Sequence, residues 1–210
     1  MQLDKALAQI SEIHAQVLKS EVFRGYRAAT MAITGGVAVL AAAVQSTWVR
    51  PADAVEFVVF WVAVAAVCAV ICASDLLYGC LRRQQRLGRW RSLLVVAQSM
   101  PALLVGGVVT AVLVQWHGFA SLLPGLWALF FALGIWSVRP YLPKAIGVVA
   151  AFYGMAGTWM LVQSHGVAVP APWWMGATFG VGQLAAAGVL YLNLERPLHA
   201  PEPGARRSRG

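Results

Sequence analysis

The chain has 210 residues, of which 60% are apolar and only 11% are charged, and its mean hydropathy is +0.68. The surface of a water-soluble domain carries far more charge than this, so the composition excludes an ordinary soluble protein. The formal net charge of +8 is compatible with nucleic-acid binding. Basic loops beside an anionic membrane surface explain the same excess, and we therefore expect a lipid bilayer and no nucleic acid as the partner.

The first part of the chain predicts an amphipathic helix on the cytoplasmic side. Within residues 1–27, apolar residues such as Leu3, Leu7 and Ile10 recur at helical spacing. The acidic and basic residues nearly balance, so apolar burial rather than attraction to anionic lipid must hold the helix in place. We expect it to lie flat at the membrane or to pack under the bundle. The alternative is self-association, or a protein partner, through residues 3–20.

Long apolar stretches follow, and a helix needs about 20 residues to cross a bilayer. The first two are Ala28 to Val49 and Phe57 to Tyr78, which are separated by Arg50-Pro51-Ala52-Asp53. The next two, Leu93 to Val138 and Ala145 to Leu194, hold no charged residue and are each long enough to cross twice. The pattern therefore predicts six membrane-spanning helices.

The turning points of the two longest stretches are visible as helix breakers. Trp116-His117-Gly118 comes before Pro124, and Ser164-His165-Gly166 comes before Pro170. Glycine and proline at these places end one helix and allow the next to begin. We predict an all-α fold in which residues 28–194 form a polytopic transmembrane bundle of six helices arranged as three hairpins.

The distribution of basic residues predicts the orientation of this bundle. Every Lys and Arg except Arg50 falls on one side of the six-span arrangement. Cytoplasmic loops are enriched in Lys and Arg, so we assign that side, and both chain termini, to the cytoplasm. Residues 195–210, rich in Pro, Gly and Arg, are expected to form a disordered basic cytoplasmic tail.

Small residues predict where helices approach each other closely. They recur at four-residue spacing as Ala28, Ala32 and Gly36 on the first span and as Gly176 and Gly180 on the last. Such spacing favours close packing between membrane helices.

Tryptophan residues cluster where the spans are expected to meet the outer surface of the membrane. An indole ring is stable at the boundary between lipid and water, so they are interpreted as anchors rather than as ligand-stacking groups. They are Trp48, Trp116, Trp127, Trp173 and Trp174.

Asp75 is the acidic residue that lies well inside an apolar span, about one turn from its inner end. A carboxylate there opposes the helix dipole and is costly in lipid, so it needs a cation or must take up a proton. We expect an ion pair that fixes topology, with Arg24, Arg27, Arg82 or Arg139 as the cation. A proton or ion relay is the alternative.

Three neutral polar residues also lie within the spans, namely Gln98, Tyr153 and Gln183. Polar groups in a membrane must face protein or water, so these side chains predict either a small polar cavity or hydrogen bonds between helices. We expect hydrogen bonds, because the spacing of the three residues does not bring them to one place.

The sequence offers no catalytic, cofactor-binding or metal-ligating set. Cys68 and Cys72 share a helical face and are interpreted as packing residues, while His117 and His165 lie on two outer turns without a third ligand. Neither histidine is at the depth expected for haem ligation, and no hydrolase or phosphate-binding motif is present. We therefore expect a protein that is not an enzyme and needs no cofactor or metal.

Two short patterns resemble those of known proteins. The segment from Glu21 to Arg27 follows an amphipathic start, and Gly134-Ile135 comes before Arg139, Leu142 and Pro143. In these features the chain resembles small six-helix inner-membrane proteins of bacteria that have no assigned activity. The resemblance implies a six-helix fold and a bacterial cytoplasmic (inner) membrane, and it implies no catalytic or binding residues.

Together these patterns predict a multi-pass integral membrane protein that acts through protein contacts as a non-enzymatic regulatory, sensory or accessory subunit. The alternative is a small-solute or proton-coupled transporter. In that case Asp75, Gln98, Tyr153 and Gln183 would lie along its route.

Overall fold

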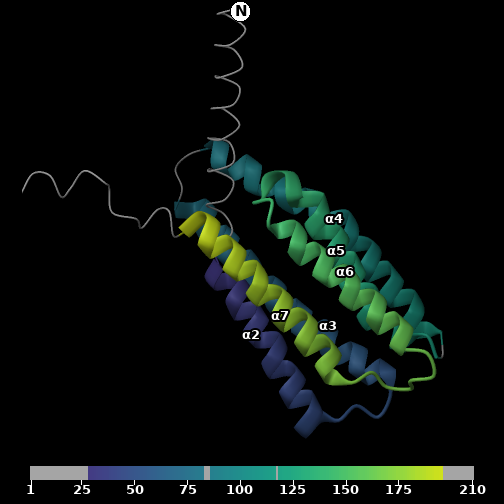
Figure 1. The fold of residues 1–210 in the computed structure, drawn as a ribbon. Helices are drawn as coiled ribbons and strands as arrows, with labels where there is room; N and C mark the ends of the chain where they lie inside the picture. Colours follow the sequence, from purple (N-terminus) through teal and green to yellow (C-terminus); the bar gives the residue numbers. More distant parts are fainter. Residues whose placement is uncertain (1–27, 83–85, 117, 196–210) are drawn as a thin grey trace, which may run out of the picture.

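A computed structural model describes residues 28–82, 86–116 and 118–195, and all regular structure within them is helical (Figure 1). The predicted amphipathic helix within residues 1–27 and the tail after residue 195 lie outside the described residues. The long helices are α2 (Ala28–Val44), α3 (Ala54–Arg82), α4 (Arg86–Gln115), α5 (Leu123–Val138), α6 (Ile146–Gln163) and α7 (Pro172–Leu190). Short helical turns extend or join them: η1 (Gln45–Val49), η2 (Ala120–Leu122), η3 (Arg139–Tyr141) and η4 (Tyr191–Glu195).

Six helices in the described part of the chain are long and apolar enough to cross a membrane, which confirms the predicted number of spans. Each of the two longest apolar stretches turns back once, around the predicted sites. Gly118 and Gly166 have positive φ angles of 90° and 76°, a backbone conformation that glycine adopts without strain. The spans run over Ala28–Val49, Ala54–Tyr78, Val96–Gln115, Ala120–Tyr141, Ile146–Gln163 and Pro172–Asn193.

Helix α3 begins three residues earlier than the apolar pattern predicts, because polar side chains cap its first turn. The Asp53 carboxylate accepts a hydrogen bond from the backbone N–H of Glu56 at 2.8 Å. The Glu56 carboxylate in turn accepts one from the backbone N–H of Ala52, also at 2.8 Å. This reciprocal arrangement resembles a capping box, and it allows the helix to start at Ala54.

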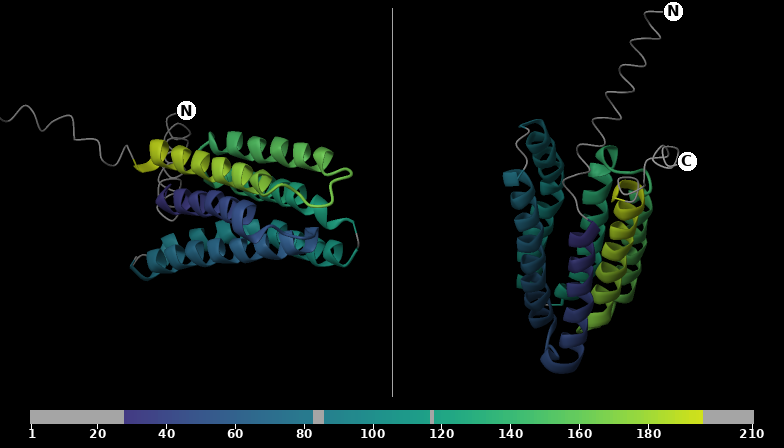
Figure 2. Two further views of the ribbon diagram at one scale, coloured as in Figure 1. Left: turned by 90° about the horizontal axis from the view of Figure 1, so that it is seen from below. Right: turned by 90° about the vertical axis from the view of Figure 1, so that its left-hand side faces the viewer.

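The most extensive helix packing joins α2 to α7 and α5 to α6, so helices from different predicted hairpins lie side by side (Figure 2). Glycines on α7 make the first contact possible. A Cβ atom added at Gly176 would lie 2.3 Å from the Cβ of Ala42, and one added at Gly180 would lie 2.5 Å from Val39 Cγ2. The predicted role of Gly176 and Gly180 in close packing is confirmed.

The matching prediction for α2 is only partly right. Ala28 is buried, and Ala32 packs against the same cluster. Gly36 has nothing near its missing side chain, and the neighbouring Gly35 faces α7 instead. A Cβ at Gly35 would lie 3.1 Å from the carbonyl oxygen of Gly180.

Helices α5 and α6 touch through a pair of glycines. A Cβ added at Gly125 would lie 2.8 Å from the carbonyl oxygen of Gly157, and a Cβ added at Gly157 would lie 2.8 Å from that of Gly125. The two backbones are therefore in direct contact, a geometry that only glycine permits at both positions.

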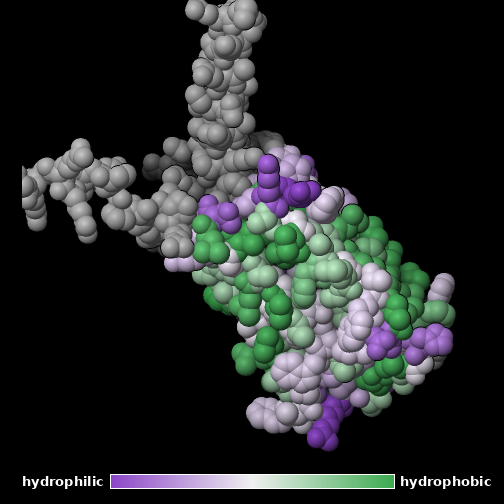
Figure 3. All heavy atoms as spheres, in the orientation of Figure 1, coloured by the Kyte–Doolittle hydropathy of each residue, from purple (hydrophilic) through white to green (hydrophobic). Residues whose placement is uncertain are grey.

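The helix ends alternate between two sides of the bundle, as three hairpins require (Figure 1). The start of α2, the junction of α3 with α4, the turn between α5 and α6 and the end of α7 lie at one end. The other connections lie at the opposite end, together with Arg50. Hydrophilic residues gather at both ends, and the visible surface between them is largely apolar (Figure 3).

Candidate functional site

Gln45 is a fully buried polar residue in the turn η1 that extends α2. Its side-chain oxygen accepts a hydrogen bond of 2.7 Å from the indole N–H of Trp61 on α3. Its side-chain nitrogen has no hydrogen-bond partner within the described residues. A buried amide that satisfies only half of its hydrogen-bonding capacity is costly, so the surrounding packing must hold it in place.

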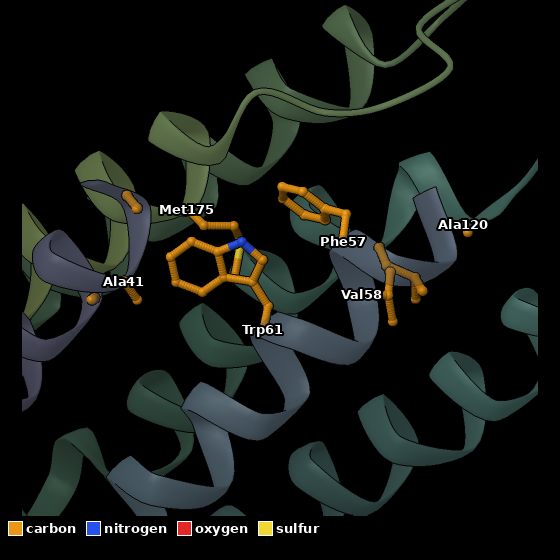
Figure 4. Close-up of a cluster of buried hydrophobic side chains, with 9 residues drawn as sticks. Ala41, Phe57, Val58, Trp61, Ala120 and Met175 are labelled. Atoms are coloured by element: carbon orange, nitrogen blue, oxygen red, sulfur yellow. The ribbon is translucent and has the colours of Figure 1, made fainter. Parts of the chain in front are cut away.

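That packing is a cluster of apolar side chains that joins four helices at one end of the bundle (Figure 4). Phe57, Val58 and Trp61 of α3 are the large side chains at its centre; Trp61 lies near Met175 of α7, and Val58 faces Ala120 of η2. Gln45 was not among the residues predicted to form a site. The sequence feature that could have pointed to Gln45 is an amide side chain at the end of an apolar span, directly before Ser46-Thr47-Trp48.

Asp75 lies in the opposite half of α3 and accepts a hydrogen bond of 2.8 Å from the hydroxyl of Thr30 on α2. Thr30 is buried, so a helix interface provides one of the partners that this carboxylate needs. Arg24, Arg27 and the side chain of Arg82 lie outside what the structure describes, and the ion pair stays a prediction. Arg139 is engaged elsewhere: its guanidinium carbon lies 4.6 Å from the centre of the Trp136 ring.

Gln98 is exposed on α4, and it connects two segments that are distant in the sequence. Its side-chain N–H donates to the hydroxyl of Tyr141 over 3.1 Å. Tyr141 ends the short turn that follows α5. The contact is a hydrogen bond between elements of the bundle, of the kind that the sequence analysis favoured over a cavity.

Tyr153 of α6 is completely buried within a cluster of aromatic rings. The ring centres of Phe131, Phe179 and Phe152 lie 4.8 Å, 5.4 Å and 5.7 Å from its own. On α7, Gly182 leaves the space that the phenol ring occupies, since an added Cβ would lie 2.3 Å from the Cζ atom of Tyr153. The hydroxyl has no hydrogen-bond partner among the described residues.

Gln183 follows Gly182 on α7 and is half-buried. Its Cβ lies 3.1 Å from the position of a Cβ added at Gly35, so it packs against α2, whereas Gly182 packs against Tyr153 of α6. Neighbouring positions of α7 thus serve two different helix contacts. The four candidate polar residues are distributed over separate contacts, and the described hydrogen bonds join no two of them.

The described residues were also compared with the predicted absence of a metal site. No group of three His, Cys, Asp or Glu side chains in them lies close enough to hold a metal ion. Cys68 and Cys72 are half-buried free thiols on α3, and His165 is exposed on its turn. His117 lies outside the described residues, so a shared site for the two histidines is not tested.

Six apolar helices of membrane-spanning length, packed through glycine contacts and interhelical hydrogen bonds, define a multi-pass membrane protein. Comparisons with protein-family models, with curated proteins and with solved structures find nothing that matches the chain. The resemblance to small bacterial inner-membrane proteins therefore extends only to this class, and no family is identified.

Proposed function

We propose that the protein is a non-enzymatic subunit of a membrane assembly, with a regulatory, sensory or accessory role that it performs through protein contacts. The observation that carries the proposal is the dispersal of the polar residues inside the spans. Asp75 bonds Thr30, Gln98 bonds Tyr141, and Tyr153 is sealed among aromatic rings. A solute route needs polar groups that follow one another along a path, whereas these groups each serve a separate helix contact.

The outward faces of α3 and α4 support the same role. Large apolar side chains stand exposed along both helices, including Val67 and Val70 on α3 and Leu104 and Val108 on α4. A bilayer requires such a surface, and it also allows other membrane helices to pack there. The proposed partner contact itself lies in residues 3–20, outside the described part, where the sequence predicts an amphipathic helix of nearly balanced charge.

The distribution of charge supports a location in a bacterial inner membrane with both termini in the cytoplasm. All Lys and Arg residues except Arg50 precede α2, lie within residues 82–91 at the end of α3 and the start of α4, lie between α5 and α6, or follow α7. The described helix ends next to these segments lie at one end of the bundle, which the positive-inside rule assigns to the cytoplasm. Labelling of a tag at either terminus in intact cells and in opened cells would test the orientation.

A pair of matched deletions tests the proposal. One variant lacks residues 2–20, and the control lacks residues 198–210 at the other terminus. After crosslinking in cells and purification through an internal tag, the full chain and the control should recover the same partners. The variant without residues 2–20 should lose them. Recovery of identical partners by both deletions would contradict the proposed contact.

A flux measurement separates this proposal from the transporter alternative. Proteoliposomes that contain the full chain would be compared with proteoliposomes that contain D75N or a variant with Gln98, Tyr153 and Gln183 all replaced. The proposed role predicts the same proton and solute flux in all three. A flux present with the full chain and lost with D75N would instead favour a transporter that uses Asp75 as a relay.

A further inference from the structure

The turn between α5 and α6, residues 139–145, carries two cations that the bundle does not neutralise. Arg139 begins the turn and Lys144 lies near its end, and both side chains are exposed. Neither forms an ion pair within the described part of the chain. We call residues 139–145 the cationic turn.

The guanidinium of Arg139 is held in a defined orientation. Its carbon lies 4.6 Å from the centre of the Trp136 ring, as in a cation–π contact. The guanidinium also lies close to Gly147 in the first turn of α6, where an added Cβ would lie 3.2 Å from Nε and 3.6 Å from Cζ. The ring and the bare backbone therefore confine the guanidinium, and its N–H groups are left available for an outside acceptor.

Apolar surface lies directly beside these cations on the membrane side. Leu133 and Trp136 on α5 and Val148 on α6 are more than half exposed, with Val148 at 73%. A ligand that satisfies both features must carry a negative group and an apolar chain.

We propose that the cationic turn binds the phosphate headgroup of an anionic glycerophospholipid. The Arg139 guanidinium donates two parallel N–H bonds to phosphate oxygens, and Lys144 acts as a second point charge. The acyl chains lie against Leu133, Trp136 and Val148. The site is independent of the proposed role in protein contacts, because it requires only the bilayer as a partner.

Native mass spectrometry of the full chain in mild detergent tests the site, with phosphatidylglycerol or phosphatidylcholine added at equal concentration. The wild-type protein should retain phosphatidylglycerol preferentially. A basic residue near an anionic membrane surface contributes about 1 kcal/mol, a factor of about five in affinity. R139Q and K144Q should each weaken retention by about fivefold. R50Q, which removes an exposed cation at the opposite end of the bundle, should leave it unchanged.

Two variants that keep the net charge distinguish a built site from general attraction. R139K retains the cation but loses the planar fork, and G147A presses a methyl group against Nε. Both should lower phosphatidylglycerol retention by about twofold to fivefold, since bidentate geometry is lost in each. Retention at the wild-type level in both, or an equal loss in R50Q, would overturn the proposal.

Competition with a soluble anion identifies the source of the phosphate group. Inorganic phosphate at the same concentration as the lipid should not displace phosphatidylglycerol, because it lacks the chains that cover the apolar surface. Displacement at equal concentration would show that the turn binds free phosphate, and would overturn the assignment to a lipid.

Discussion

The indole N–H of Trp61 donates a hydrogen bond of 2.7 Å to the side-chain oxygen of Gln45, and both residues are buried. A second polar contact between the same two helices joins Thr30 to Asp75 in the other half of α3. Helix α3 is therefore held to α2 by a hydrogen bond towards each end. By contrast, glycine contacts hold α2 to α7 and α5 to α6. The attachment of α3 thus depends more on polar groups than these two contacts do.

Replacing Trp61 with phenylalanine tests the contact at the first of these positions. W61F keeps an aromatic ring but removes the one hydrogen bond that the described residues give to the buried Gln45 amide, and it should lower the free energy of unfolding by about 1 kcal/mol. Unfolding in detergent by heat or denaturant would measure this change in the free energy of unfolding. W48F is the matched control, since Trp48 is 84% exposed. The double variant Q45L/W61F should lose less than the two single variants combined, and additivity would contradict the pairing.

Replacing Thr30 with valine tests the contact in the other half of α3. T30V conserves the side-chain shape but removes the hydroxyl that donates to Asp75, so it should destabilise the protein by about 1–3 kcal/mol. T47V is the control, because the exposed Thr47 hydroxyl bonds only Ala43 O within its own helix. Equal unfolding transitions for the two variants would show that the Thr30 hydroxyl contributes nothing to stability.

The contact between α5 and α6 should not tolerate a methyl group. G157A would place a Cβ 2.8 Å from the carbonyl oxygen of Gly125 and 3.0 Å from the backbone of Leu129, so the two helices must move apart. Such overpacking costs about 1–3 kcal/mol. G154A lies on the same helix with nothing within 4 Å, and it should be neutral or slightly stabilising. A loss of stability in G154A as large as in G157A would show that the close contact with Gly125 is not the cause.

The number and approximate bounds of the spans were predictable because the length of an apolar run is a local property of the sequence. The turns were predictable for the same reason, since Gly118 and Gly166 stand where each long run must reverse. Helix pairing was not, because it depends on which face each helix presents. Gly35 and Gly36 are adjacent and chemically identical, and only the packing shows that Gly35 is the one facing α7.

For the candidate polar residues, too, the sequence predicted their presence inside the spans but not their partners. Gln98 donates a hydrogen bond to Tyr141 in the turn η3, a partner that is remote in the sequence and could not be named. The Tyr153 hydroxyl, for which the same kind of bond was expected, has no partner among the described residues. The five tryptophans predicted as membrane anchors differ in their surroundings. Trp48, Trp116 and Trp173 are well exposed. Trp127 donates to the Thr110 hydroxyl, and Trp174 packs on Trp159, so these two also have packing roles.

Removing the Tyr153 hydroxyl, unlike the substitutions above, should not destabilise the protein. Y153F keeps the ring among Phe131, Phe152 and Phe179 but removes a buried oxygen that has no hydrogen-bond partner among the described residues. The variant should therefore be as stable as the wild type or more stable by about 1 kcal/mol, because the cost of burying that oxygen is removed.

Tyr141 provides the comparison for Y153F, because its hydroxyl accepts the hydrogen bond from Gln98. Y141F should lower the free energy of unfolding by about 0.6 kcal/mol, the average for such bonds in membranes. The two variants are to be unfolded side by side in the same detergent. Destabilisation by Y153F equal to that by Y141F would show that the Tyr153 hydroxyl bonds a partner in the folded protein. The role of Tyr153 would then be to bind a solute or water in the core rather than to pack between helices.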